Sequence, residues 1–243
     1  MDLQLKDKVI IVTGGSKGIG NGICNVLAEE GAIPVIIGRN KVDVISAVKK
    51  IKVKGYKAAY ALAELTNPDE CKAAIEKVIK EFNKIDGLIN NAGVNDSIGL
   101  ENGTYYEFME SIKKNVAHYY SMAHLALPAL KKSKGSIVNI GSIEGIGANP
   151  NHASYCASKA GLHGLTRAIA VDHGKDDVRC NAVAPGWIDT ELNEDFINSM
   201  PDSKQFRNSI GSIHPVNRTG KTEEVASLVA WLASTESSFV TGQ

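Results

Sequence analysis

Short apolar runs rich in β-branched residues alternate along the chain with longer segments whose apolar residues recur every three or four positions. The short runs predict strands at Lys8–Thr13, Ile33–Ile37, Lys57–Ala61, Gly87–Asn90, Ser136–Ile140 and Val178–Ala184. Several of these runs are apolar on both faces, which is typical of strands buried in a parallel sheet. The longer segments predict helices at Gly18–Glu30, Lys41–Lys54, Pro68–Phe82, Tyr105–Lys132, Ala153–His173 and Thr222–Ala233.

This alternation predicts an α/β fold, because each right-handed crossover between parallel strands places its helix against the sheet. We expect a single doubly wound, mostly parallel sheet with helices on both faces. The length of 243 residues fits one such domain, residues 1–243. The segment Trp187–Ser212 has weaker periodicity and disperses Asn, Asp, Ser and Pro. It predicts a mobile substrate flap, although an ordinary surface excursion fits the same composition.

The charge and cysteine content exclude several classes of function. Lys plus Arg and Asp plus Glu number 27 each, so no net field attracts nucleic acid or an anionic membrane. No apolar run is long enough for a membrane span or a signal peptide. The four cysteines lack the spacing of a disulfide framework or a zinc site, so we expect no metal and a reducing, cytoplasmic location.

A glycine-rich run follows the first predicted strand directly and opens the first helix: Thr13-Gly14-Gly15-Ser16-Lys17-Gly18-Ile19-Gly20. Glycine lets the backbone turn sharply and approach a pyrophosphate, whose charge is met by amide groups at the helix start. The spacing is the wider GxxxGxG form rather than GxGxxG. A lone glycine cluster is often only a tight turn, but at the head of an alternating chain it predicts a Rossmann-type dinucleotide site.

The end of the second predicted strand indicates which dinucleotide binds. Dinucleotide folds place an acid there against the ribose hydroxyls, or a base against a 2′-phosphate. Gly38 occupies the place of the acid, Arg39 follows it, and Lys17 is a second cation. Because no carboxylate is expected to repel a 2′-phosphate, we predict that NADP(H) is preferred and that NAD(H) is possible. The alternative is that Arg39 merely caps the sheet edge.

Tyr155 and Lys159 are four residues apart on a predicted helix and therefore share one face. A free phenol has a pKa of about 10, and a nearby cation lowers that value by roughly 1–3 units. Such a phenol acts as an acid or a base near neutral pH. By itself the spacing also fits a half-buried tyrosine beside a solvated lysine.

The chain resembles the short-chain dehydrogenase/reductase family over nearly its whole length. The motifs that carry the resemblance are Thr13–Gly20, Asn90–Gly93, Ser142, Tyr155–Lys159, and Pro185-Gly186 with Thr190. The resemblance implies that Tyr155 exchanges a proton with the substrate oxygen while a hydride passes between carbon and nicotinamide. It implies that Lys159 lowers the pKa of Tyr155 and binds the nicotinamide ribose. It also implies that Ser142 hydrogen-bonds the substrate oxygen and that Asn115 holds a water in the proton relay.

The resemblance further implies a set of cofactor contacts. The pyrophosphate contacts are Gly14, Ser16, Lys17, Gly18, Ile19 and Gly20, and Arg39 lies at the adenosine 2′ position. The other adenosine contacts are Glu64, Leu65, Asn91, Ala92 and Gly93. The nicotinamide contacts are Pro185, Gly186, Ile188 and Thr190, together with Tyr155 and Lys159. Glu64 departs mildly from the family, which usually has Asp there.

Several segments resemble bacterial sugar dehydrogenases more specifically, most closely those that oxidise L-fucose: Met1–Leu3, Ala32–Val35, Asp86–Leu100 and Asn115–His124. A polyol needs several hydrogen-bonding partners to replace its water. Besides Ser142, the candidates for substrate binding are Asn95, Asp96, Glu144, Asn149, His152 and Trp187. Each of them is also compatible with an ordinary polar loop residue, and Trp187 is also compatible with an anchor at the hinge of the flap. The resemblance therefore favours oxidation of an aldose at its anomeric hydroxyl to a lactone.

Two other functions stay open: a 3-oxoacyl-[acyl-carrier-protein] or other carbonyl reductase, and a non-catalytic nucleotide-binding protein. Retention of all four catalytic residue types argues against the second. If the carboxyl-terminal tail is present, we also expect a homotetramer paired through the helices Tyr105–Lys132 and Ala153–His173, in which His118–Ala129 and Ala160–Ala170 provide small and apolar faces. Family members continue into a last strand and a tail near Gln243, so we expect a truncated chain or a disordered end. Without the tail, the sheet edge beside the sixth strand is expected to be bare.

Overall fold

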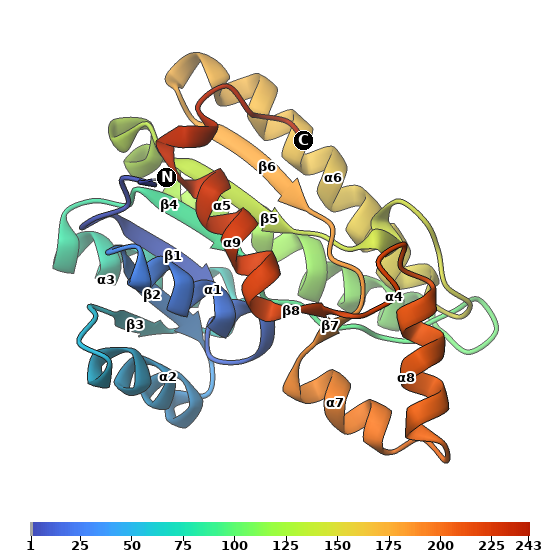
Figure 1. The fold of residues 1–243 in the computed structure, drawn as a ribbon. Coiled ribbons are helices and arrows are strands. Elements are labelled where there is room, and N and C mark those ends of the chain that lie inside the picture. The colour runs from blue at the N-terminus through green and yellow to red at the C-terminus, as the bar shows by residue number, and fades with distance from the viewer. Residues whose placement is uncertain (1) are drawn as a thin grey trace.

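The computed structural model describes residues 2–243 as a six-stranded parallel sheet between two layers of helices (Figure 1). The strands are β1 (Val9–Thr13), β2 (Ile33–Gly38), β3 (Ala59–Leu62), β4 (Gly87–Asn90), β5 (Ser136–Ile140) and β6 (Arg179–Val183). Their order is β3-β2-β1-β4-β5-β6, so the winding reverses between β1 and β4. The predicted doubly wound α/β fold is confirmed, and the reversal places a crevice at the carboxyl ends of the strands.

Three helices cover each face of the sheet (Figure 1). One layer holds α1 (Gly18–Glu29), α2 (Lys41–Val53) and α9 (Thr222–Ala233), and the other holds α3 (Pro68–Phe82), α5 (His118–Ser133) and α6 (Ala153–His173). In β1, Ile10 and Val12 pack with the first layer, whereas Val9 and Ile11 pack with the second. Successive side chains of a strand point to opposite faces, so a sheet covered on both sides requires such uninterrupted apolar runs.

Side-chain caps determine where several helices begin. The Asn40 side chain accepts hydrogen bonds from the amides of Val42 and Asp43 at 3.0 and 3.2 Å, which starts α2. The predicted start of α3 is also confirmed, because Asn67 caps it and Pro68 is its first residue. An amide that has no partner inside the helix is satisfied in each case.

The helix predicted at Tyr105–Lys132 is not continuous. α4 (Tyr105–Ile112) and α5 are joined by a π-helical turn at Lys113–Ala117. The apolar periodicity runs through this turn without a break, so the sequence pattern did not indicate it. The turn carries Asn115, whose side chain is fully buried, and π-helical turns of this kind frequently occur at functional sites.

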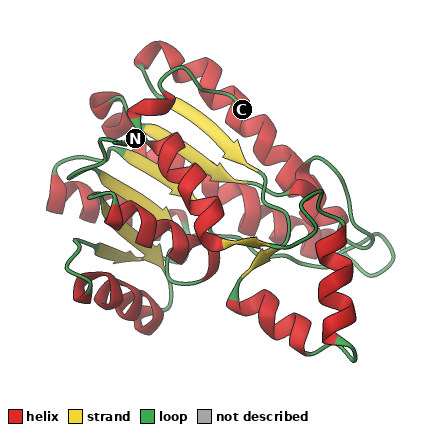
Figure 2. Cartoon of the chain, in the orientation of Figure 1, coloured by secondary structure: helices red, strands yellow, loops and turns green. Residues whose placement is uncertain are grey.

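The flap predicted at Trp187–Ser212 contains regular structure (Figure 2). It comprises β7 (Ile188–Asp189), α7 (Glu191–Asn198) and α8 (Ser203–Ser212), and β7 pairs in parallel with the later β8 (Gly220–Lys221). Thr190 and Asp202 cap the two helices by accepting hydrogen bonds from backbone amides at 3.3 and 2.8 Å. Helices this short carry too little periodicity to stand out in the sequence, and the mobility of the flap stays a prediction.

Three aromatic rings give the flap a small core of its own. The ring centroid of Trp187 lies 6.4 Å from that of Phe196 and 6.3 Å from that of Phe206, and the two phenyl centroids are 5.8 Å apart. Stacked and edge-on aromatic pairs at these separations are favourable. Trp187 is therefore the anchor on which both flap helices pack.

Backbone hydrogen bonds cover the outer edge of β6. The Gly242 amide donates to the Cys180 carbonyl and the Ala182 amide donates to the Gln243 carbonyl, both at 2.7 Å. The expected bare edge is therefore wrong, because the residues after α9 return along β6.

Short 3-10 turns lie at Ile143–Gly145, Gly174–Asp176 and Thr235–Ser237. Within residues 2–243, no helix is long and apolar enough to cross a bilayer, and no cluster of at least three His, Cys, Asp or Glu side chains forms a metal site.

Candidate active site

A cavity opens at the carboxyl ends of the central strands, where the sheet order reverses. The loops after β4 and β5, the first turns of α6 and the start of the flap surround it. Its polar lining consists of Asn91, Asn95, Ser142, Glu144, Asn149, Tyr155, Lys159, Trp187 and Asn193. Doubly wound sheets bind ligands at this position, and the fold places three of the four predicted catalytic side chains in this one cavity.

Lys159 lies deep in the cavity wall with only 3% of its surface exposed. Its Nζ donates a hydrogen bond to the Ile140 carbonyl at 2.8 Å. The same nitrogen is 5.6 Å from the ring centroid of Tyr155 and 5.5 Å from that of Tyr119. Burial disfavours the ammonium form and lowers the pKa of Lys159 to about 7.

Burial also dominates the behaviour of Tyr155. It raises the pKa of the Tyr155 phenol to about 12, a hydrogen bond with Ser142 opposes the rise, and the Glu144 carboxylate adds to it. The pKa of Tyr155 therefore lies above its ordinary value instead of below it, because desolvation of the phenol outweighs the effects that oppose it. Tyr155 is therefore a protonated acid at neutral pH. That Lys159 lowers this pKa stays a prediction.

Ser142 follows β5 directly and caps the short turn Ile143–Gly145. Its Oγ accepts a hydrogen bond from the Glu144 amide at 3.1 Å, and the residue is 8% exposed. The Ile143 amide donates to the Pro185 carbonyl at 3.1 Å, which joins this loop to the chain after β6. A hydroxyl both donates and accepts, so Ser142 can donate its proton to the Tyr155 oxygen or to a substrate oxygen in the cavity.

Asn115 lies behind the cavity rather than in its lining. Its Oδ1 accepts a hydrogen bond from the Val94 amide at 2.9 Å, and its Nδ2 donates to Ser111 Oγ at 3.4 Å. A Cβ atom on Gly93 would lie 2.8 Å from the same Oδ1. The Asn115 side chain thus fixes the loop after β4 and leaves no room for a side chain at position 93, which is glycine. The predicted role of Asn115 in holding a water stays a prediction.

The glycine loop forms a cradle that larger residues would fill. Gly14 and Gly18 have φ angles of 65° and 53°, which residues with a Cβ atom rarely adopt. A Cβ on Gly20 would press against the Gly14 carbonyl and the Asn91 amide. Helix α1 begins directly after Lys17 without a side-chain cap, so its first amides are available to an anion. These features fit a dinucleotide pyrophosphate.

A second cavity continues beside the glycine loop. It is lined by Gly14, Ser16, Arg39, Asn40, Asp43, Glu64, Leu65, Thr66, Ala92, Gly93, Lys114 and His118, among others. Thr13 Oγ1 accepts hydrogen bonds from the amides of Asn91 and Ala92 at 2.9 and 3.1 Å, which fixes the chain after β4 against β1. All the predicted adenosine contacts except Asn91 therefore line this one cavity, and Asn91 lines the first cavity.

The two cations predicted to bind a 2′-phosphate are each paired with an acid. Arg39 Nη1 lies 2.9 Å from Glu64 Oε2, and Lys17 Nζ lies 2.9 Å from Asp43 Oδ2. The expectation that no carboxylate is present there is wrong, because the ends of β2 and β3 and the start of α2 meet in space. The pKa of Glu64 is lowered, chiefly by its hydrogen bond to Arg39.

The predicted substrate contacts divide into two groups. Ser142 and four others line the cavity, namely Asn95, Glu144, Asn149 and Trp187. Asp96 does not line it and instead accepts hydrogen bonds from Ser111 and Ser154 at 3.1 and 2.8 Å. His152 also lies behind the lining, where its Nδ1 is 2.7 Å from Glu144 Oε2.

The start of the flap completes the cavity. Ile19, Pro185, Gly186 and Ile188 belong to the lining, and Thr190 lies next to Gly18, whose added Cβ would be 3.4 Å from its Cγ2. Asn193 was not predicted. It lies three residues after the capping Thr190, a spacing that would have indicated a helix start, and its Nδ2 donates to the Ile188 carbonyl at 2.8 Å.

Comparisons with known proteins cover almost the whole chain. Residues 14–243 match the family described as enoyl-(acyl carrier protein) reductase. The curated 3-oxoacyl-[acyl-carrier-protein] reductase of Chlamydia muridarum is 35% identical over 245 residues, which cover 100% of this chain and 96% of that protein.

Two solved structures of sugar enzymes are also similar. Aldohexose dehydrogenase of Thermoplasma acidophilum is 35% identical with a TM-score of 0.87, covering 100% of this chain and 92% of that one. L-Sorbose reductase of Gluconobacter frateurii, solved with NADPH and L-sorbose, is 26% identical with a TM-score of 0.94, covering 100% and 95%. The sequence relatives thus agree with the reductase alternative, and these structures agree with an enzyme that acts on sugars.

Proposed function

Because the chain belongs to the short-chain dehydrogenase/reductase family and is an NAD(P)-dependent oxidoreductase, we propose that it oxidises the anomeric hydroxyl of an aldose to a lactone. L-Fucose or a stereochemical relative is the substrate that we favour. The observation that carries this proposal is the carboxamide lining of the cavity, provided by Asn95, Asn149 and Asn193.

A carboxamide both donates and accepts hydrogen bonds and carries no charge. It therefore suits a neutral polyol, whose hydroxyls must find partners when they leave water. Lys159 is the only basic side chain that lines the cavity within residues 2–243, and Glu144 lines the same cavity. An anionic substrate would meet this carboxylate without a free cation to offset it, which supports a neutral substrate.

The reaction requires a proton transfer at one oxygen and a hydride transfer at the adjacent carbon. When bound, the nicotinamide supplies the hydride acceptor. Ser142 donates a hydrogen bond to the substrate oxygen, and the ionised Tyr155 phenol takes its proton as the carbonyl of the lactone forms. In the reverse direction, the protonated Tyr155 returns that proton. In its ammonium form, Lys159 stabilises the phenolate.

NADP(H) is the cofactor that we favour, with NAD(H) as a possible second. Arg39 lines the cavity for the adenosine half, and Lys17 pairs with Asp43, which lines it too. The side chains of Arg39 and Lys17 are 77% and 61% exposed, so both can move. A 2′-phosphate carries more charge than either carboxylate partner and competes for both cations. The sugar enzyme solved with NADPH supports this preference.

Reduction of a 3-oxoacyl-[acyl-carrier-protein] is the second candidate. The matched family description and a relative that is 35% identical over the whole chain favour it over aldose oxidation. The same Tyr155 acid serves this reaction, because burial raises the pKa of its phenol to about 12 and keeps the proton on it at neutral pH.

One comparison separates the two candidates. Purified enzyme is assayed for NADP⁺ and NAD⁺ reduction with a panel of aldoses that includes L-fucose, and for NADPH oxidation with a 3-oxoacyl thioester. We expect aldose-dependent NADP⁺ reduction and little activity on the thioester. Efficient thioester reduction without activity on any aldose would replace the first candidate by the second.

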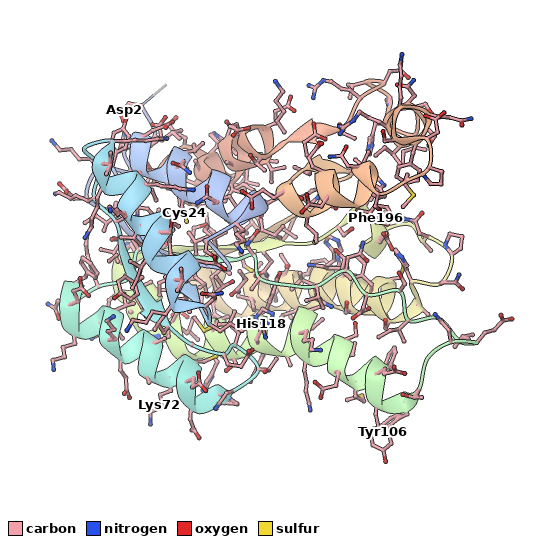
Figure 3. The ribbon with its side chains drawn as sticks, turned by 90° about the horizontal axis from the view of Figure 1, so that it is seen from below. Asp2, Cys24, Lys72, Tyr106, His118 and Phe196 are labelled. Atoms are coloured by element: carbon pink, nitrogen blue, oxygen red, sulfur yellow. The ribbon has the colours of Figure 1, made fainter. Side chains whose placement is uncertain are left out.

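We also favour a homotetramer paired through α4–α5 and α6. Tyr106 points outward from α4 (Figure 3), and it and Tyr120 are 79% and 60% exposed. His118, by contrast, is buried and does not belong to this face. Light scattering coupled to gel filtration measures the mass directly, and a monomer at micromolar concentration would contradict the assembly.

A further inference from the structure

Glu144 is a nearly buried carboxylate at the substrate end of the cavity, with 9% of its side chain exposed. Its Oε1 accepts a hydrogen bond from Asn149 Nδ2 at 2.9 Å. Its Oε2 accepts from His152 Nδ1 at 2.7 Å and from Cys156 Sγ at 3.5 Å. A buried carboxylate requires such partners to offset its lost hydration, so this position is built to hold a negative charge.

His152 joins this carboxylate to the loop after β4. While Nδ1 faces Glu144, its Nε2 lies 3.2 Å from Ser97 Oγ on the loop after β4. The histidine donates through Nδ1 in both its neutral and its cationic form. The Glu144–His152 pair therefore connects the loop after β5, the start of α6 and the loop after β4.

The same pair borders the Tyr155 phenol. The rings of His152 and Tyr155 meet edge to face with centroids 6.4 Å apart. The titratable groups that face Tyr155 are Asp96 after β4, Tyr119 on α5, Glu144 after β5, and His152, Cys156 and Lys159 at the start of α6. Among them Lys159 favours the phenolate, whereas the carboxylates favour the phenol.

We propose that Glu144, clasped by His152, is a positioning residue that keeps the Tyr155 phenol protonated and so sets the alkaline pH at which alcohol oxidation begins. This inference rests on the hydride-transfer function proposed above. Lys159 and Glu144 line the same cavity as Tyr155 and act on its phenol with opposite sign, and Lys159 Nζ lies 5.6 Å from the Tyr155 ring centroid. A protonated phenol donates its proton to a carbonyl, so the balance favours reduction at neutral pH and oxidation at higher pH.

Glu144→Gln tests this inference because glutamine keeps the size and an accepting oxygen but removes the charge. The midpoint of the pH profile of kcat/KM for oxidation should move to lower pH by about one unit, which is about tenfold in rate on the acid side. A purely structural role for Glu144 would lower the rate at every pH without moving the midpoint, and that result would overturn the proposal.

Asp86→Asn provides a matched control. Asp86 has the same side-chain exposure of 9%, but it pairs with Lys8 and Lys84 at the opposite end of the strands. This variant should lose thermal stability and keep the wild-type midpoint. An equal shift of the midpoint in both variants would also overturn the proposal.

A measurement without substrate separates this inference from the proposed function. Protein labelled with ¹³C at the tyrosine Cζ is titrated by NMR, and the Tyr155 signal is the one absent from Tyr155→Phe. Glu144→Gln should begin to ionise Tyr155 at a lower pH than the wild type. A shift without turnover of any aldose would refute only the proposed substrate, and turnover without a shift would refute only the role of Glu144.

Discussion

Replacing Lys159 by methionine should stabilise the fold while it abolishes catalysis. The ammonium is 3% exposed, and burial lowers its pKa from 10.5 to about 7. A shift of this size corresponds to an upper bound of about 5 kcal/mol of unfavourable free energy for the charged lysine in the folded protein. Methionine has a similar length and no charge to desolvate, so the variant escapes this cost.

The lost hydrogen bond reduces the gain. The Ile140 carbonyl accepts from Lys159 Nζ at 2.8 Å and from Tyr119 Oη at 3.2 Å, so it keeps one donor in the variant. Losing a hydrogen bond from a charged group costs about 1.5–3 kcal/mol. We therefore expect a net stabilisation of about 2 kcal/mol at neutral pH, which corresponds to a rise in Tm of about 5 °C for a domain of this size.

The pH dependence tests the cause. The pKa of Lys159 is lower in the folded chain than in the unfolded chain, so the unfolded chain binds more protons between about pH 7 and pH 10.5. The full cost of burying the charged lysine applies below about pH 7, and this cost is absent above about pH 10.5. Between these two values the free energy of unfolding of the wild type therefore rises with pH. Urea unfolding at fixed protein concentration should therefore show a difference between variant and wild type that narrows with pH. A variant less stable than the wild type at neutral pH, or a difference independent of pH, would refute the reasoning.

Three further predictions concern the proton donor and the cofactor site. Tyr155→Phe should lower turnover by about 10³-fold and leave the Kd for NADP⁺ unchanged in a fluorescence titration; substantial remaining activity would place the acid elsewhere. Gly20→Ala pushes a Cβ atom against the Gly14 carbonyl and should cost about 1–3 kcal/mol, with weaker dinucleotide binding; an unchanged Tm and Kd would contradict the cradle. Glu64→Gln releases Arg39 and should raise the preference for NADP⁺ over NAD⁺ a few-fold, because an exposed ion pair contributes less than about 1 kcal/mol; an unchanged ratio of kcat/KM values would show that the pair does not matter.

The sequence predicts the parts of the fold and site that depend on local pattern. The apolar run at Val9–Val12 identifies a strand buried on both faces, and the glycine loop after it predicts the turn and the helix start. The spacing of Tyr155 and Lys159 predicts a shared helix face, which α6 provides.

Features that depend on distant segments could not be read in the same way. The ion pair between Arg39 and Glu64 joins residues 25 positions apart, whose proximity follows from the ends of β2 and β3. The raised pKa of Tyr155 depends on how deeply the phenol is buried, and no residue spacing reports that depth. The π-helical turn around Asn115 was hidden because the apolar pattern of the flanking helices continues through it.

The short β7–β8 ladder has a consequence for how new specificities arise on this fold. Ile188 is paired with Gly220 and Asp189 with Lys221. The segment between the two strands therefore starts and ends at neighbouring points of the structure. An insertion or deletion inside such an excursion changes its closure entropy only slowly with length. The stretch from Glu191 to Thr219 can therefore be exchanged as a unit: replacing it with the corresponding segment of a homologue would reshape the cavity mouth and spare the proton-transfer residues and the nucleotide cradle.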